Sequence, residues 1–96
     1  MYAVVLIRYR RPMEEVAEAT PDHRAYLAGL HQQGILLASG PFDPRTGGML
    51  LLRIPDEDPP LLERIRDGDP FHQRGLADYE LQRWAPTIGV DELARL

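Results

Sequence analysis

The sequence contains no cysteine and no lysine. Without cysteine, these 96 residues have no disulfide bonds, thiolate metal ligands or thiol nucleophiles. Without lysine, Schiff-base chemistry and the phosphate-binding lysine of a P-loop are also excluded. All eleven basic residues are arginine, and only Arg8, Arg10 and Arg11 lie close together. A net charge of −4 with scattered arginines argues against nucleic acid as a partner.

Long hydrophobic runs are missing as well, since no apolar stretch approaches the roughly 18 residues that span a bilayer. Residues 1–8 have no charged leader and no small-residue cleavage site, so they are typical of a strand rather than a signal peptide. We therefore expect a cytoplasmic protein. The hydrophobic share of 44% and the charged share of 27% are those of a globular chain, and residues 1–96 fit one domain.

Apolar patterning and turn-forming residues divide the chain into strands and helices. Thr20 and Pro21 have the residue types of an N-cap and a first helical residue, and Gly34 is typical of a helix end. Turn formers over 43–48 predict the loop of a hairpin. The predicted strands cover 2–9, 35–40, 49–54 and 77–84, and the predicted helices cover 20–33 and 59–66, with helical turns at 13–19, after Asp69, and at 91–95.

The resulting order β-α-β-β-α-β predicts the α+β class, with a ferredoxin-like four-stranded antiparallel sheet. Two helices cover only one face of such a sheet, yet the strands at 2–9 and 49–54 are apolar on both faces. The second face therefore needs another cover. A second copy of the chain, giving a homodimer, is the cover we expect, and the alternative is that the C-terminal tail folds over part of this face.

His23 is the most informative single residue. It falls within the apolar stripe that Tyr26, Leu27 and Leu30 form along one side of the predicted helix. A titratable ring on an apolar face needs a polar partner. From the spacing alone, two interpretations stay open: a core histidine bonded to a backbone carbonyl, and a catalytic base facing a cleft.

Asp69 precedes Pro70 and Phe71, which is the pattern of a helix N-cap. One carboxylate oxygen can cap the turn while the other orients a histidine, because an ionised carboxylate has about four acceptor sites. The remaining histidines, His31 and His72, do not have the i, i+4 spacing of a zinc pair, so no metal site is expected.

Two further polar residues are candidates for substrate binding. Ser39 is the only serine, near the end of the second strand, and it lacks the setting of a nucleophile elbow. Arg8 interrupts one face of the first strand, where it forms a salt bridge or binds an anionic ligand. Tyr79 and Trp84 are interpreted as packing or interface aromatics.

Taken together, these segments resemble the YciI-like family of small ferredoxin-like proteins. The resemblance rests on the run from Thr20 to Leu27, Ser39-Gly40-Pro41, Asp69-Pro70-Phe71 and Gly75-Leu76. It implies a dimeric α+β barrel with a His–Asp pair in a cleft, and the matching residues here are His23 and Asp69. Members of this family are linked to ring-cleavage pathways and to the loss of chloride from chlorinated hydroxyquinols. Many relatives carry arginine three residues before the histidine, where this chain has Thr20.

The hypothesis is a cofactor-independent lyase or isomerase that acts on a small cyclic or phenolic molecule. His23 would serve as general acid or base, Asp69 would orient it, and Ser39 would donate a hydrogen bond to a substrate oxygen. The sequence has no motif for a metal, nucleotide or flavin, so no cofactor is expected. The alternatives are a small-molecule-binding or accessory protein without chemistry and, by analogy of fold, a heme- or quinone-type monooxygenase.

Overall fold

The sheet has four antiparallel strands in the order β2-β3-β1-β4, which confirms the ferredoxin-like prediction. The computed structural model describes residues 1–96. Its elements are β1 (Tyr2–Tyr9), α1 (Met13–Gln32), β2 (Leu36–Pro41), β3 (Gly47–Arg53), α2 (Leu61–Gly68), α3 (Pro70–Gln73), β4 (Ala77–Trp84) and α4 (Val90–Ala94). The strands were therefore placed to within two residues at each end by patterning alone.

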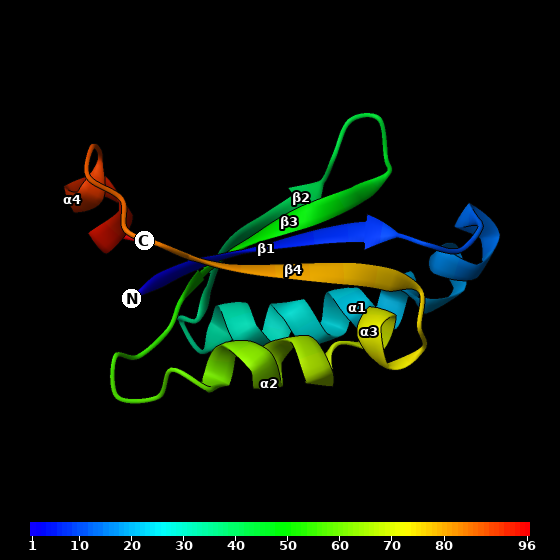
Figure 1. Cartoon of the computed structure of the whole chain (residues 1–96), viewed down its shortest axis with the longest axis horizontal. Coiled ribbons are helices and arrows are strands. Elements are labelled where there is room, and N and C mark those ends of the chain that lie inside the picture. Colours follow the sequence, from blue (N-terminus) through cyan, green and yellow to red (C-terminus); the bar gives the residue numbers. More distant parts are fainter.

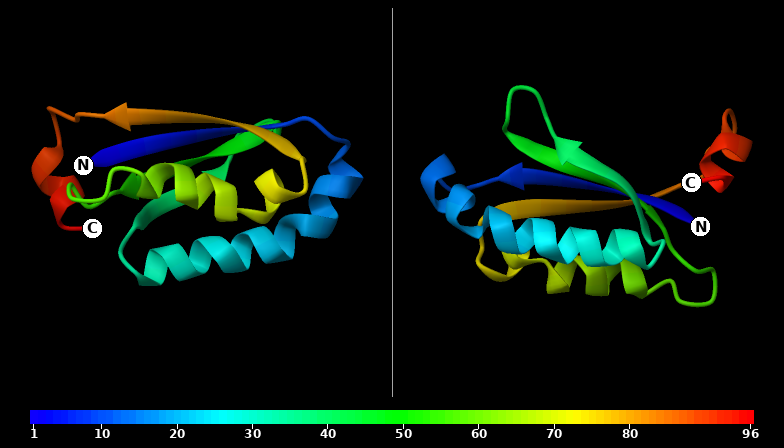
Figure 2. Two further views of the ribbon diagram at one scale, coloured as in Figure 1. Left: turned by 60° about the horizontal axis from the view of Figure 1, so that its bottom comes forward. Right: turned by 180° about the vertical axis from the view of Figure 1, so that it is seen from behind.

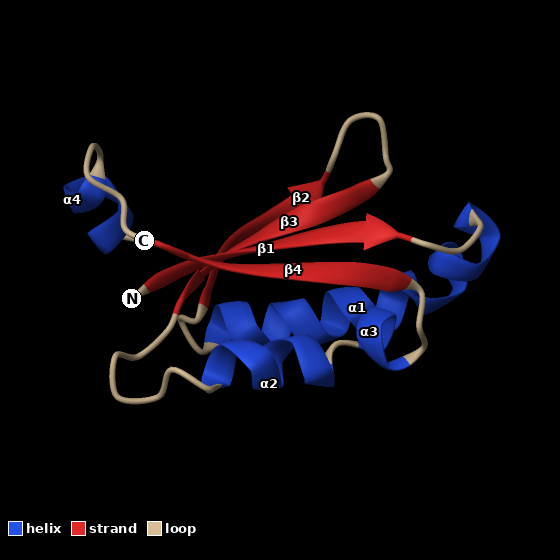
Figure 3. Ribbon diagram, in the orientation of Figure 1, coloured by secondary structure: helices blue, strands red, loops and turns tan.

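The helices α1, α2 and α3 all cover the same face of the sheet, below the strands in Figures 1 and 3. The left panel of Figure 2 shows α1 and α2 running beside one another across that face. Ala3, Val5 and Ile7 of β1 point toward the helices and are at most 2% exposed, and Val5 pairs with Leu50 of β3. The hydrophobic core therefore lies between this face and the helices.

The prediction that a helix begins at Thr20 was wrong, because α1 begins at Met13 and continues through Pro21. Thr20 does not cap a helix, and its hydroxyl donates instead to the carbonyl of Val16 at 2.8 Å. Val16 and Ala19 are at most 1% exposed and continue the buried side of the helix before the proline. Burial of that apolar stripe against the sheet overrides the local start signal, although proline removes a backbone donor.

An irregularity in β2 aims its serine toward the helices. The pairing of β2 with β3 shifts register between Leu36 and Ala38, and Ser39 then pairs with Leu50. Directly opposed residues of neighbouring strands share a face, and the side chain of Leu50 is buried under the helices. Ser39 therefore lies on the same face of the sheet as α1.

The other face of the sheet carries no helix. Val4, Leu6 and Leu51 are half-buried there, while Met49 and Trp84 are 39% and 45% exposed. The C-terminal tail does not lie across this face. In Figure 1 and in the right panel of Figure 2, α4 lies beyond the start of β1 and the end of β4. Arg53 holds the tail there through the main-chain oxygens of Leu93 and Leu96, at 2.6 and 3.0 Å.

None of the helices is both long enough and apolar enough to cross a membrane.

Candidate active site

The fold brings His23 of α1 against Asp69, the residue that precedes α3. The Nδ1 atom of His23 lies 2.7 Å from Oδ1 of Asp69, across 46 residues of sequence. The side chains are 12% and 1% exposed, respectively. Burying a carboxylate is costly unless it is paired and hydrogen-bonded. The contact with His23 therefore explains how Asp69, a residue type that is rarely buried, is tolerated in the interior.

Asp69 also begins α3, and one oxygen atom does both tasks. Oδ1 accepts from the backbone N–H of Phe71 at 3.0 Å as well as from His23. The sequence had suggested that one oxygen caps the helix while the other orients the histidine, and the structure differs on this point. The second oxygen, Oδ2, is buried without a hydrogen-bond partner. The side chain of Asp69 is held in place because its Oδ1 atom accepts hydrogen bonds from both the α3 backbone and His23 of α1.

The hydrogen bond to Asp69 determines the tautomer of His23. A carboxylate accepts, so Nδ1 carries the hydrogen and Nε2 of the neutral ring is left with a free lone pair. Nε2 has no hydrogen-bond partner in the protein and is not among the fully buried polar atoms. His23 thus presents a basic nitrogen to the outside of the pair, which is the arrangement that proton abstraction requires.

Phe71 fixes the plane of the imidazole. Its ring lies parallel to that of His23, with centroids 3.9 Å apart and an interplanar angle of 6°. Phe71 is 2% exposed and meets Tyr9 of β1 edge to face at 5.9 Å. The imidazole is therefore held by a hydrogen bond at one edge and by a buried aromatic ring on one side.

A cavity of about 180 Å³ opens beside the pair, between α1 and the β2–β3 side of the sheet. This volume is below the roughly 300 Å³ at which sites for drug-sized ligands begin, and it suits a molecule with a single ring. Its walls combine apolar side chains with a few polar ones. The polar residues that line it are Tyr9, Thr20, His23, Arg24, Ser39 and Arg45. Ser39 and His23, both predicted from the sequence as site residues, therefore line the same cavity.

The phenol of Tyr79 lies near Asp69. The hydroxyl of Tyr79, on β4, is buried and has no hydrogen-bond partner, as is Oδ2 of Asp69. Burial raises the pKa of Tyr79, and the negative charge of Asp69 raises it further. Tyr79 therefore keeps its proton and stays neutral next to Asp69.

The remaining candidates from the sequence lie elsewhere. Arg8 points away from the helices, is paired with Glu80 of β4 at 3.6 Å, and does not line the cavity. His31 bonds the carbonyl of Leu36 at 2.8 Å, and His72 meets the ring of Tyr79 edge to face. No group of three or more histidine, aspartate or glutamate side chains has the arrangement of a metal site.

Sequence reasoning missed Phe71, Arg24 and Arg45 as parts of the site. Arg24 lies within the run from Thr20 to Leu27 that carries the family resemblance, directly after His23, but that run gives it no role of its own. Arg45 stands in a predicted loop, where nothing in the local pattern indicates which way the side chain points. Phe71 follows Asp69 by two residues. A side chain that bonds Asp69 therefore lies close to Phe71, and this closeness in sequence was the one signal that could have identified Phe71.

The sheet, the helices on one of its faces and the buried His–Asp pair define a small ferredoxin-like domain with a histidine–carboxylate contact beside a cavity. The model of the YCII-related domain matches residues 1–85, so the chain belongs to that family. Among curated proteins, none matches the sequence.

One similar solved structure is 5-chloro-2-hydroxyhydroquinone dehydrochlorinase (TftG) from Burkholderia phenoliruptrix AC1100, in complex with 2,5-dihydroxybenzoquinone. It has a TM-score of 0.74 and 22% identity, over 91% of this chain and 96% of that one. At this identity the likeness establishes the shared fold.

Proposed function

We propose that this protein is a lyase or isomerase that acts on a small cyclic or phenolic molecule by acid–base catalysis. His23 is the catalytic base and Asp69 orients it. The observation that carries this proposal is the 2.7 Å contact between Nδ1 of His23 and Asp69, because it leaves Nε2 free on a residue that lines the cavity.

The proposed reaction needs only proton transfer and, in an elimination, the departure of a leaving group. Nε2 of His23 takes a proton from a C–H or O–H group of the bound ring. In an elimination, the electron pair of that bond forms the new double bond while the leaving group departs with its own electron pair. In an isomerisation, His23 returns the proton to a different atom. In both cases Asp69 stabilises the imidazolium that forms when Nε2 takes the proton, as a carboxylate does for any histidine base. After an elimination the imidazolium gives this proton to the leaving group or to solvent.

One comparison and one property of the cavity support this class of substrate. The similar dehydrochlorinase is named for removing chloride from a hydroxyhydroquinone and was solved with a dihydroxybenzoquinone. The cavity here is of single-ring size and is lined by Ser39, whose hydroxyl we assign as a donor to a substrate oxygen. No residue of the chain is assigned to a cofactor in this mechanism.

We further propose that the working form is a homodimer in which two copies pack through the helix-free face of the sheet. Val4, Leu6 and Leu51 give that face an apolar centre, and Met49 and Trp84 extend it with substantial exposure. A contiguous apolar face of this kind is typical of an interface, and a two-fold pair buries the same residues on both copies.

The test is a screen of hydroxyquinols, chlorinated hydroxyquinols and lactones for turnover by the wild-type protein. His23→Ala should then lower kcat by about 10²- to 10⁴-fold, the range that a general base contributes. His31→Gln is the matched control, because His31 bonds a backbone carbonyl and an amide can replace it. The control should retain the activity of the wild type.

Full activity of His23→Ala would overturn the proposed mechanism. Saturable binding of these compounds without any product, with affinity changed in His23→Ala, would instead indicate the non-catalytic ligand-binding protein.

A further inference from the structure

Two of the arginines that line the cavity form no ion pair with a carboxylate of the protein, which distinguishes them from most arginines of the chain. Six of the eleven arginines form ion pairs with carboxylates, namely Arg8, Arg10, Arg11, Arg64, Arg66 and Arg74. Arg53 is taken up by main-chain oxygens of the tail. In a chain with net charge −4, arginines without a carboxylate partner are therefore the minority.

Two of the remaining arginines, Arg24 and Arg45, line the cavity. Arg24 forms neither a hydrogen bond nor an ion pair through its side chain, and Arg45 makes only a long contact of 3.5 Å, from Nε to the hydroxyl of Tyr9. They come from different elements, Arg24 from α1 and Arg45 from the loop between β2 and β3. Two exposed arginines from separate segments of the chain therefore line one cavity.

The walls of this cavity contain no acidic residue. The nearest carboxylate assigned to the site, Asp69, is 1% exposed, lies behind His23 and is already committed to it. An unpaired guanidinium beside an acid-free wall favours an anion, and its planar fork matches a carboxylate through two parallel hydrogen bonds.

We propose that the ligand of this cavity is an organic anion, a ring that bears a carboxylate, and that Arg24 and Arg45 bind its charged group while His23 faces the ring. This inference rests on the proposed function for the role of His23, and it adds the charge of the substrate.

The experiment compares two ligands of the same shape and different charge, salicylate and the neutral salicylamide, at neutral pH. Binding is measured by calorimetry, and the NMR signals of the His23 ring report whether each ligand occupies this cavity. Salicylate should bind about tenfold more tightly than salicylamide, the difference that a charge-assisted hydrogen bond provides. Added salt should weaken the binding of salicylate alone.

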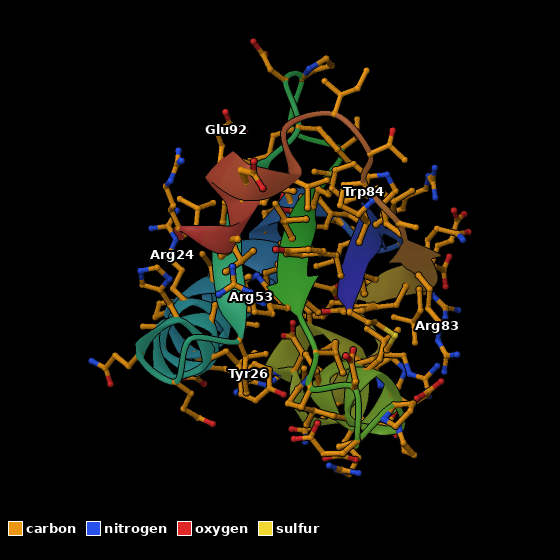
Figure 4. The ribbon with its side chains drawn as sticks, turned by 90° about the vertical axis from the view of Figure 1, so that its left-hand side faces the viewer. Arg24, Tyr26, Arg53, Arg83, Trp84 and Glu92 are labelled. Carbon is orange, nitrogen blue, oxygen red and sulfur yellow. The ribbon has the colours of Figure 1, made fainter.

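Arginine variants locate the source of that preference. Arg24→Gln and Arg45→Gln should each lower the preference for salicylate about threefold, and the double variant should abolish it. Arg83→Gln is the matched control, because Arg83 also lacks a carboxylate partner but lies on the opposite side of the fold from Arg24 in Figure 4 and does not line the cavity.

Equal binding of the two ligands, no binding of salicylate at millimolar concentration, or an unchanged preference in both single variants would overturn the anion site. The two proposals fail separately. Arginine-dependent binding of salicylate without any His23-dependent turnover leaves the anion site standing and removes the enzyme. Turnover of neutral phenols that needs His23, with no preference for salicylate, does the reverse.

Discussion

The imidazole of His23 lies flat against the ring of Phe71, with centroids 3.9 Å apart. The backbone N–H of the same Phe71 donates a hydrogen bond to Asp69, the carboxylate that contacts His23. His23, Asp69 and Phe71 thus contact one another in a closed set that joins α1 to α3. We therefore expect a substitution at any one of the three to affect the position of the other two.

Replacing Phe71 with leucine should lower catalysis more than it lowers stability. Leucine keeps a buried apolar side chain but cannot offer a flat surface, so the ring of His23 gains freedom about its hydrogen bond to Asp69. We expect kcat to fall about tenfold, because misorientation of a catalytic group is costly, with about 1 to 2 kcal/mol lost in the free energy of unfolding. Turnover assays and chemical denaturation measure both.

The control for this substitution is Phe42→Leu, since Phe42 is the other phenylalanine of the chain and does not line the cavity. Its kcat should equal that of the wild type. An equal loss of kcat in both variants would mean that the parallel ring at position 71 has no special effect on His23.

Asp69 has two tasks that two substitutions can separate. Asp69→Asn keeps an oxygen that can accept from the N–H of Phe71, whereas Asp69→Ala removes the cap as well as the charge. The cap is worth about 0.5 to 2 kcal/mol, so Asp69→Ala should unfold at lower denaturant concentration than Asp69→Asn. Both should lose about 10²-fold or more in kcat, because the imidazolium loses its counter-charge.

Nitrogen-15 NMR of the histidine rings gives an independent readout for these variants. In the wild type it should show the hydrogen of neutral His23 on Nδ1. Asp67→Asn, at a carboxylate outside the cavity, is the matched control and should change neither the tautomer nor kcat. Wild-type kcat in Asp69→Asn would reduce Asp69 to a helix cap.

Much of the fold could be predicted from sequence because its signals are local. Gly34 ends α1 with a positive φ of 76°, as a glycine after a helix favours. The start of α1 could not be read in the same way. Thr20 and Pro21 carry a strong local start signal, but the decisive interaction is the burial of Val16 and Ala19 on a sheet formed by distant strands.

The site was predictable only in part, for a related reason. His23 stood out within an apolar stripe, but its partner Asp69 came from the family resemblance, since no spacing rule links residues that are 46 positions apart. Arg8 illustrates the limit. Both faces of β1 are apolar, so its pattern does not reveal that Ile7 faces the helices and that Arg8 therefore faces away from the cavity.

A charge placed on the helix-free face should dissociate the proposed homodimer. Leu6 lies on β1 near the middle of the sheet and is half-buried by its own chain. Leu6→Glu would bury a carboxylate without a partner in a face-to-face interface, which costs several kcal/mol. Light scattering coupled to size exclusion should give a dimer for the wild type and a monomer for the variant.

The control places the same charge on an exposed apolar residue outside that face. Ile88 is 95% exposed in the tail beyond β4, so Ile88→Glu should leave the dimer intact. A monomeric wild type, or a dimer that survives Leu6→Glu, would contradict packing through this face.

The stability of the protein should fall above about pH 10, and Tyr79 and Tyr26 should cause much of the loss. Burial raises the pKa of each phenol, and the negative charge of Asp69 raises both further. An unfolded tyrosine releases its proton near pH 10, while these two keep theirs in the folded state. Above that pH the unfolded chain binds fewer protons than the folded one, so rising pH favours unfolding. Without lysine or cysteine, tyrosines dominate titration in this range.

The two tyrosines differ in a way that separates this effect from ordinary hydrogen bonding. The hydroxyl of Tyr26 donates to the carbonyl of Ile65 at 2.7 Å, whereas the hydroxyl of Tyr79 has no partner. At neutral pH, Tyr26→Phe should lose about 1 kcal/mol in the free energy of unfolding, and Tyr79→Phe should lose none, because it removes a buried polar group that was not satisfied.

At alkaline pH both variants should resist unfolding to a higher pH than their neutral stabilities alone would predict. Denaturation curves across the pH range, followed together with tyrosinate absorbance, measure both effects. A loss at neutral pH in Tyr79→Phe as large as that in Tyr26→Phe would mean that the Tyr79 hydroxyl does bond Asp69, and the pair would then be a triad.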